Sequence, residues 1–326
     1  MSKSKTNATP DCGCPTGDCR PSRRQFFSRG AQSIAAIGVA VQSGATARAA
    51  RLKPSGWLPT GLGQTRDMTA ADGLVYVAGD SAVAVLKPGG EPVRRMEFAE
   101  APRCIAVAKR RLFVGLRDRV LLCDLAGETQ AETKRLAKGA ALTSLAVAED
   151  GTIFAADGGS SSIWRISPDG EVLDRLAGGK GGRFAVPKSF FPITWADGGL
   201  VVAHPGRHRV ERYDADGELL ARWGKRSRGL AGFSGCCNPV SVAVTGSGEF
   251  VTAERGQPRI KLFGKDGKFR SVIAGPEAFD AEEHEQVETD AELVTCQNGG
   301  IEVGLLGDQV VALDHTTASF RLFDLA

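Results

Sequence analysis

One sequence pattern recurs six times between residues 74 and 326. Each copy contains a short apolar run, a polar loop, a run in which apolar and polar residues alternate, and a turn that usually holds glycine. Several short strands in a period of about 40–50 residues are typical of a β-propeller blade. We therefore predict an all-β protein with the fold of a six-bladed β-propeller. The copies, aligned on Val75, Leu112, Ile153, Leu200, Phe250 and Val310, lie 37, 41, 47, 50 and 60 residues apart.

A further short strand is expected ahead of most copies, as in 104–107, 144–147 and 241–244, which brings each period to four strands. Asp-Gly and Gly-Gly pairs between the runs predict hairpin turns. The last copy ends after its third strand, so the final blade lacks one strand. We expect the segment 51–58 to supply this strand and to close the ring, because closure removes exposed sheet edges.

Two of the copies resemble the NHL repeat. Residues 209–217 read RVERYDADG and residues 259–267 read RIKLFGKDG, which is similar to the core of that repeat, N-x-R-[IV]-x-x-[FY]-x-x-x-G. The resemblance covers about residues 55–326 and is strongest in the third to fifth copies; in the first two, Asp80 and Arg117 begin shortened loops. It implies an NHL/TolB-like propeller that binds its ligand on one face, around the central channel.

The N-terminal region has the organisation of an export signal. Arg23 and Arg24 precede Gln-Phe-Phe, a mildly apolar stretch follows at 31–44, and small residues follow at 47–50. This pattern resembles a twin-arginine (Tat) signal peptide. We expect residues 1–50 to be the signal region, residues 51–326 to be the propeller, the Tat translocase to be a partner during export, and the protein to be periplasmic. The 14 apolar-rich residues fall short of the about 20 that span a bilayer, so membrane association is expected only if the signal is not cleaved.

Composition excludes several other functions. The net charge is +3 and no basic cluster with interleaved aromatic residues occurs in the body of the chain, so we expect no nucleic-acid partner. The sequence contains no P-loop, no HExxH and no CxxCH motif. These absences argue against nucleotide hydrolysis, zincin chemistry and c-type haem.

Polar residues end the second strand of four repeats. In a propeller the second strands end on the face where the first strands begin, so these side chains are expected around the channel. Carboxylate and imidazole groups there suit a divalent cation or acid–base chemistry. The alternative is that they cap the following loops through backbone hydrogen bonds. The residues are Asp157, His204, Glu254 and Asp314, with His315 adjacent.

Four of the five cysteines in the body of the chain are expected on the same face. Cys104 begins the first strand of the second blade, the adjacent pair Cys236 and Cys237 precedes that of the fifth, and Cys296 precedes that of the sixth. Cys123 lies in a third strand and is expected to be a small buried apolar residue. Five cysteines allow at most two disulfides in a monomer.

The adjacent cysteines permit three uses, which the sequence leaves open. Cys236, Cys237 and Cys296 could bind a soft metal ion together with His204. Cys236 and Cys237 could form a strained vicinal disulfide, which would be a rigid surface or a redox switch. Cys236 and Cys296 could form a disulfide between neighbouring blades. A metal ion or redox centre is the cofactor that the first two uses imply. Three further cysteines, Cys12, Cys14 and Cys19, precede the paired arginines and leave with the signal if it is cleaved.

Three functions are compatible with these features. The first is an exported propeller that binds a ligand or protein partner on its channel face, with or without a cysteine-based metal or redox centre. The second is a metal-dependent lyase or hydrolase of the gluconolactonase or amidating-lyase type; four histidines match the latter incompletely. The third is an interaction scaffold without catalysis, so the sequence leaves open whether the chain is an enzyme. The first strands begin with Asp67, Cys104, Ser144 and Ser241, a poor match to a gluconolactonase site.

Overall fold

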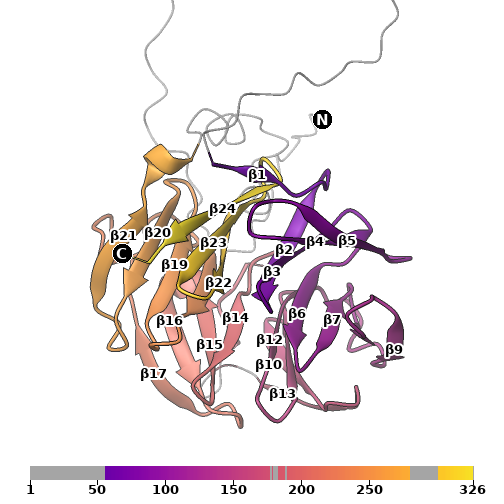
Figure 1. Cartoon of the computed structure of the whole chain (residues 1–326). Helices are drawn as coiled ribbons and strands as arrows, with labels where there is room; N and C mark the ends of the chain where they lie inside the picture. Colours follow the sequence, from indigo (N-terminus) through magenta and orange to yellow (C-terminus); the bar gives the residue numbers. More distant parts are fainter. Residues whose placement is uncertain (1–55, 177, 179–182, 188, 280–299, 326) are drawn as a thin grey trace, which may run out of the picture.

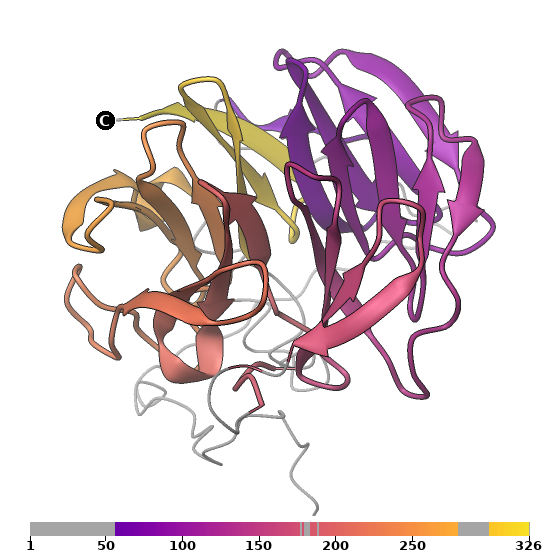
Figure 2. The ribbon, with the colours of Figure 1, turned by 90° about the horizontal axis from the view of Figure 1, so that it is seen from below.

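The computed structural model describes residues 56–176, 178, 183–187, 189–279 and 300–325. They form six four-stranded antiparallel sheets, arranged as the blades of a propeller (Figures 1 and 2). The predicted all-β, six-bladed architecture is therefore confirmed. Among the described residues, helical structure is limited to two 3-10 turns, Pro205–Arg207 and Pro276–Ala278. No helix in this part of the chain combines the length and the apolar character that crossing a bilayer requires.

The first three blades follow one another along the chain. Blade 1 consists of β2 (Thr65–Ala71), β3 (Leu74–Gly79), β4 (Ala82–Leu86) and β5 (Pro92–Glu97). Blade 2 consists of β6 (Cys104–Ala108), β7 (Arg111–Gly115), β8 (Val120–Cys123) and β9 (Thr129–Glu132). Blade 3 consists of β10 (Leu142–Val147), β11 (Ile153–Asp157), β12 (Ser162–Ile166) and β13 (Val172–Leu176).

The next two blades repeat this order, and the last one combines both ends of the described chain. Blade 4 consists of β14 (Ile193–Ala196), β15 (Gly199–His204), β16 (Arg209–Tyr213) and β17 (Leu219–Trp223). Blade 5 consists of β18 (Ser241–Val244), β19 (Phe250–Glu254), β20 (Arg259–Phe263) and β21 (Phe269–Ala274). Blade 6 consists of β22 (Ile301–Leu306), β23 (Gln309–Asp314), β24 (Ser319–Asp324) and β1 (Leu58–Pro59).

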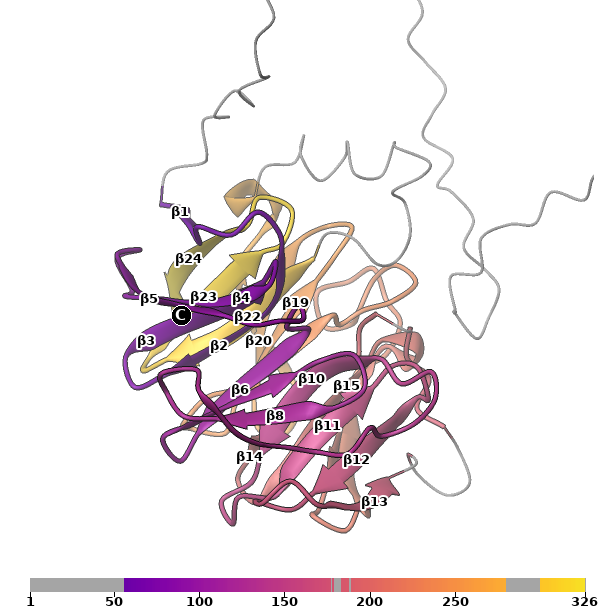
Figure 3. The same ribbon diagram turned by 90° about the vertical axis from the view of Figure 1, so that its right-hand side faces the viewer.

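The ring closes through the N-terminal strand. β1 pairs antiparallel with β24, with Leu58 opposite Phe320, and lies beside it in Figure 3. The Thr60 hydroxyl donates a hydrogen bond of 2.8 Å to the carbonyl of Ala318. The prediction that an N-terminal strand completes the last blade is confirmed, with the strand at Leu58–Pro59; residues 51–55 of the expected segment lie outside the described residues.

Much of the apolar core lies between neighbouring blades. One cluster joins blades 1 and 2 and includes Tyr76 and Ile105; another joins blades 4 and 5 and includes Val201 and Phe233. Middle strands such as β4 and β20 are buried along their whole length, whereas outer strands such as β5 and β17 expose most of their side chains. Burial of one valine or leucine contributes about 1.5–3 kcal/mol, so packing between blades holds the ring together.

The first strand of each blade is its innermost strand. β2, β6, β10, β14, β18 and β22 pack against one another in that order, and β22 packs against β2, so they form a closed ring around the middle of the molecule (Figure 1). Each second strand runs antiparallel to its inner strand. The starts of the inner strands and the ends of the second strands therefore share one face, which we call the channel face.

Asp-Gly turns join third and fourth strands, as the sequence predicts. Gly217 and Gly267 adopt φ angles of +85° and +72°, in the left-handed region that favours glycine. In the first of these turns, Asp214 Oδ1 accepts hydrogen bonds from the backbone N–H groups of Asp216 and Glu218. Local side-chain hydrogen bonding of this kind explains why Asp and Gly recur at these positions.

Candidate functional site

The four polar residues predicted at the second-strand ends lie there and are buried. Asp157, His204, Glu254 and Asp314 end β11, β15, β19 and β23, and each is less than 5 % exposed. The hydrogen bonds described for each go to its own blade or to the segment that leads into that blade. In the part of the chain that the structure describes, no group of three or more His, Cys, Asp or Glu side chains is arranged to hold a metal ion.

Two of these carboxylates cap loops. Asp157 Oδ1 accepts hydrogen bonds from the N–H groups of Ala141 and Gly159, at 2.8 and 2.9 Å, and Oδ2 accepts one from the Trp164 indole at 3.2 Å. Asp314 Oδ1 accepts the N–H of Thr316 at 2.8 Å. These contacts correspond to the loop-capping alternative, because the lone pairs of the carboxylates are directed at the adjacent backbone.

His204 is held on both ring nitrogens. Nε2 accepts the backbone N–H of Ala185 at 2.9 Å, and Nδ1 lies 3.2 Å from Glu211 Oε2. Burial lowers the pKa of His204, although Glu211 opposes this shift. Burial also disfavours the charge of Glu211, but contacts with His204, Tyr213 and Arg209 outweigh it and lower the Glu211 pKa to about 2. The acceptor lone pair of His204 is therefore used by the segment that leads into blade 4.

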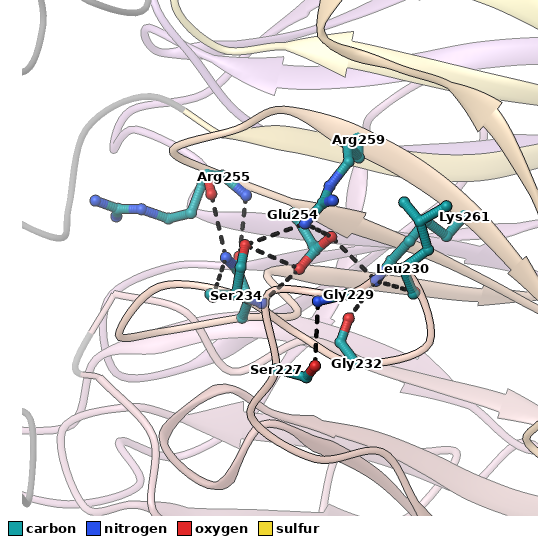
Figure 4. Close-up of polar contacts among 10 residues, drawn as sticks. Ser227, Gly229, Leu230, Gly232, Ser234, Glu254, Arg255, Arg259 and Lys261 are labelled. Carbon is teal, nitrogen blue, oxygen red and sulfur yellow. Dashed lines mark hydrogen bonds and ion pairs between the residues drawn. The ribbon is translucent and has the colours of Figure 1, made fainter.

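Glu254 is the centre of a buried ionic network in blade 5 (Figure 4). Its Oε2 lies 2.9 Å from Arg259 Nη2 and 3.0 Å from Lys261 Nζ, and its Oε1 accepts the Ser234 N–H at 2.8 Å. Glu254 and Lys261 are fully buried. Burial lowers the pKa of Lys261, and the Glu254 charge opposes that shift. Buried charges persist when they are paired and hydrogen-bonded, and Lys261 Nζ also donates to the carbonyl of Gly232 at 2.6 Å.

This network fixes the segment that carries the adjacent cysteines. Asn238 Nδ2 donates to the carbonyl of Ser234 at 2.8 Å, and Asn238 Oδ1 accepts the N–H of Arg255 at 2.9 Å. Cys237 is buried and Cys236 is partly exposed, just ahead of β18. The segment 227–238 is thus anchored to blade 5 on both sides of the cysteine pair.

Of the other predicted cysteines, some lie inside the described residues and some outside them. Cys104 begins β6 and is buried, and Cys123 is buried in β8 as predicted; both are free thiols. Cys296 lies outside the described residues, so its relation to Cys236, Cys237 and His204 stays a prediction. The same applies to the signal residues Arg23 and Arg24, and to Cys12, Cys14 and Cys19.

Six equivalent positions at the inner strands form what we call the inner ring. In five blades the residue at this position pairs with the second strand close to the end of that strand. In blade 4 it directly precedes Ile193, the first paired residue of the inner strand. The side chain at one position can accept the N–H of the next inner strand: Ser144 Oγ accepts from Ile193 at 3.2 Å and Ser241 Oγ from Val303 at 3.1 Å. These bonds link neighbouring blades. The inner ring consists of Asp67, Cys104, Ser144, Pro192, Ser241 and Glu302.

Two adjacent members of the inner ring are carboxylic acids. Asp67 Oδ2 accepts the N–H of Ile105 at 2.5 Å, and Glu302 is close enough to Asp67 for its charge to act on the Asp67 carboxyl group. Glu302 Oε2 lies 3.4 Å from His315 Nε2, and His315 Nδ1 lies 2.9 Å from the Thr65 hydroxyl. The side chains of Glu302 and His315 are 20 % and 19 % exposed, whereas Asp67 is 6 % exposed.

Both carboxyl groups of this pair keep their protons to a higher pH than usual. Burial, reinforced by the charge of Glu302, raises the pKa of Asp67 well above its usual value, and burial raises the pKa of Glu302 to about 7. Burial lowers the pKa of His315, and burial, together with the Asp67 charge, raises that of Cys104. Cys104 is therefore held as a thiol.

Three arginines lie near the start of β6. Burial lowers the pKa of Arg103, and the charges of Arg66 and Arg117 lower it further. Arg103 Nε donates to the carbonyl of Leu142 at 3.2 Å, whereas Arg66 and Arg117 are exposed. The channel face thus carries positive charge next to the acid pair.

The sequence did not single out Glu302 and Lys261. Each occupies a polar position in an alternating strand, a pattern that usually indicates a solvent-facing side chain. Alignment of the inner strands is the signal that could have identified Glu302, because its equivalents Asp67, Ser144 and Ser241 were already noted.

The chain matches no known protein family and no curated protein sequence. Several solved structures share its fold. Virginiamycin B lyase from Staphylococcus aureus aligns with a TM-score of 0.55 at 10% identity, over 81% of this chain and 95% of that one. A catalytically inactive variant of that lyase with quinupristin gives 0.54 at 12%, over 80% of each chain. A protein of unknown function from Bacteroides thetaiotaomicron gives 0.57 at 15%, over 80% and 69%. These similarities support the propeller fold alone, and the resemblance to NHL repeats stays a prediction.

Proposed function

We propose that this protein is an exported propeller that binds a small organic anion on its channel face, where blades 6, 1 and 2 meet. The observation that carries the proposal is the partly exposed pair of Glu302 and His315 beside the buried Asp67. The other members of the inner ring are neutral, so this part of the face differs from the rest in charge and in hydrogen-bonding capacity.

The charges favour an anionic ligand. Arg66 and Arg117 repel the guanidinium of Arg103, and a bound carboxylate or phosphate would relieve that repulsion. Below about pH 7 Glu302 retains its proton and can donate a hydrogen bond to the same ligand. Above that pH, the charge on Glu302 opposes anion binding.

A thermal-shift panel of small mono-, di- and tricarboxylic acids and sugar phosphates tests this function. A ligand that binds the folded state raises the melting temperature with concentration. We expect at least one acid to stabilise the wild-type protein and Arg222→Ala, an exposed control on β17, and to stabilise Arg66→Ala much less. Failure of every acid, or equal stabilisation of Arg66→Ala, would contradict the proposal.

Acid–base catalysis is a second candidate function. A carboxyl group with a pKa of about 7 near an imidazole suits proton transfer at neutral pH, and the fold is shared with an enzyme named as a lyase. The test is turnover of lactones, amides and quinupristin by wild-type protein and Glu302→Gln. Turnover by the wild-type protein that Glu302→Gln abolishes supports catalysis at this site. If none of these substrates is turned over, catalysis is contradicted and anion binding remains the proposed function.

The proposal also includes a metal or redox role for Cys236, Cys237 and Cys296. Its support is the buried network that anchors segment 227–238. Elemental analysis and an ultraviolet–visible spectrum of exported protein, with Cys236→Ser/Cys237→Ser as the variant and Cys123→Ser as the control, distinguish the alternatives. Metal or colour that only the double variant loses supports a cofactor. If the protein is colourless and free of metal, a vicinal disulfide and a disulfide between blades remain as the alternatives. Mass spectrometry with and without reductant distinguishes these two disulfides.

Export by the Tat pathway is the last part of the proposal. It rests on Arg23 and Arg24 and on the apolar stretch that follows. Fractionation of cells that produce wild-type protein or Arg23→Lys/Arg24→Lys tests it. We expect the wild type in the periplasm and the variant in the cytoplasm; equal export of both would contradict Tat transport.

A further inference from the structure

One side-chain hydroxyl on the channel face is bonded to an imidazole. Thr65 Oγ1 lies 2.9 Å from His315 Nδ1, and on the other side of the ring His315 Nε2 lies 3.4 Å from Glu302 Oε2. Thr65 begins β2, His315 follows β23 and Glu302 lies in β22, so the three side chains meet where blades 1 and 6 pack together. A hydroxyl, a base and a third group that orients the base are the arrangement that activates a nucleophile.

The contacts determine which ring nitrogen of His315 can act as a base. A carboxylate has no proton to donate, so ionised Glu302 favours the tautomer that carries its proton on Nε2. The lone pair of Nδ1 then faces the Thr65 hydroxyl. Glu302 Oε2 is buried and has no hydrogen-bond partner among the residues that the structure describes, so it is available to the imidazole. Burial lowers the pKa of His315, which keeps the ring in the neutral form that can accept a proton.

The Thr65 hydroxyl is accessible from the channel face. Thr65 and His315 are both partly exposed. The residue paired with Thr65 is Gly79, whereas four other blades end their second strands with Asp, His or Glu, so no side chain lies directly opposite Thr65. By contrast, the hydroxyl of Thr143, at the same end of the inner strand in blade 3, donates to the carbonyl of Ala156 at 3.4 Å. A carbonyl oxygen does not act as a general base, so this contact leaves the Thr143 hydroxyl inactive.

We propose that Thr65 is the nucleophile of an acyl-transfer reaction, with His315 as its general base and Glu302 as the group that orients the ring. Thr65 Oγ1 attacks the carbonyl carbon of an ester or lactone, and its proton passes to His315 Nδ1. The bond from that carbon to the leaving oxygen breaks, and the leaving oxygen takes the proton from His315. The acyl group is then an ester of Thr65. Water attacks this ester, His315 takes the proton of the water and returns it to Thr65 Oγ1, and a carboxylic acid is released.

The inference rests on the proposed function and deepens it. The product of the reaction is a carboxylate, which is the kind of anion that the channel face is proposed to bind. Arg66, which directly follows Thr65, is exposed and carries the positive charge that such a product requires. The substrate class is therefore an ester or lactone whose acid part reaches the arginines beside blade 1.

Acetylation by 4-nitrophenyl acetate tests the nucleophile. The reaction is stopped with acid, and mass spectrometry of peptides locates the acetyl group. Hydroxylamine cleaves an ester but spares an amide, so it distinguishes acetylated Thr65 from acetylated lysines. We expect an ester on the peptide that contains Thr65 in the wild type and in Thr65→Ser, and none there in Thr65→Ala. Thr143→Ala is the matched control and is expected to be acetylated like the wild type.

His315→Gln tests the base. We expect the acetylation of Thr65 to slow by roughly 10²-fold or more, because a positioned base contributes about that much. Wild-type protein without an ester at Thr65, or equal acetylation of Thr65 in His315→Gln, would overturn the inference. Carboxylic acids could still stabilise the protein in that case, so this failure is distinct from failure of the proposed anion binding.

Glu302→Gln tests the orienting group through the pH profile. The wild-type rate of acetylation at Thr65 is expected to rise as pH increases through about 7, where Glu302 becomes charged, and the variant is expected to lack this rise. Asp67, Asp314 and Arg103 also act on this site through their charges, but they are present in both proteins. The same pH profile in both proteins would overturn the role of Glu302.

Discussion

At the residue scale, the polar side chains at the second-strand ends are buried and are bonded to neighbouring loops. The repeat alignment placed Asp157, His204, Glu254 and Asp314 at second-strand ends, and they lie there. Their partners come from loops whose paths the sequence does not specify. Glu302 was not predicted, because a polar residue in an alternating strand usually indicates a side chain that faces solvent. In a propeller, that side of an inner strand faces the ring.

Lys261 provides a stability test at this scale. Lys261→Met removes one of the two cations beside the buried Glu254 carboxylate and leaves Arg259, so we expect a loss of about 3 kcal/mol, the lower end of the cost of breaking a buried ion pair. Lys268→Met is the matched control, since Lys268 is 85% exposed and surface changes usually stay within about 0.5 kcal/mol. Urea unfolding measures both. A loss below about 1 kcal/mol in Lys261→Met would show that the ion pair is not structural.

The acid pair predicts how stability depends on pH. Glu302 has a folded-state pKa of about 7, above its usual 4.5, so the folded state binds more protons than the unfolded state between these values. Stability is therefore expected to fall as pH rises through this range, by on the order of 3 kcal/mol. In Glu302→Gln this component is absent. Unfolding free energies at pH intervals test it; identical curves for both proteins would contradict the assigned protonation.

At the element scale, the hairpins were predictable and the inter-blade links were not. Asp-Gly pairs identify the turns from local conformational preference alone. The link from Asp67 to Ile105 joins residues 38 positions apart, and its formation depends on how the blades pack. Each strand, and four of the inner-ring positions, could thus be predicted from the sequence, whereas the bonds that link the blades could not.

Gly267 tests the packing of one such turn. A Cβ there would lie 2.3 Å from Trp223 Cγ, and the φ angle is +72°. Gly267→Ala is therefore expected to destabilise by about 2–4 kcal/mol, from steric overlap and backbone strain together. Gly307→Ala is the control: its φ is +60° with no atom within 4 Å, so only about 1–2 kcal/mol of strain applies. Equal melting temperatures for the two variants would contradict the contribution of Trp223.

At the scale of the whole molecule, ring closure depends on two residues of β1. Leu58 and Pro59 pair with β24 and complete the sixth blade. The repeat count predicted this closure, because the last copy lacks one strand. The topology also predicted which strand ends share the channel face, but the chemistry at that face depends on residues that come together only when blades 1 and 6 meet.

Shortening the chain tests closure. A chain that begins at residue 56 retains β1, and one that begins at residue 62 lacks it and exposes the edge of β24. We expect the shorter chain to melt at a lower temperature and to self-associate, because an unpaired strand edge is a template for pairing. Size-exclusion chromatography and thermal unfolding compare the two. A monomeric shorter chain with unchanged melting temperature would contradict closure by β1.

The most direct test of the proposed function is the affinity for the best-stabilising organic acid as a function of pH, measured by calorimetry on wild-type protein and Glu302→Gln. We predict that wild-type affinity weakens by about tenfold between about pH 6 and about pH 8.5, as Glu302 becomes charged, and that affinity in Glu302→Gln changes little. An affinity that is independent of pH in the wild type, or that weakens equally in Glu302→Gln, would place the ligand away from the acid pair.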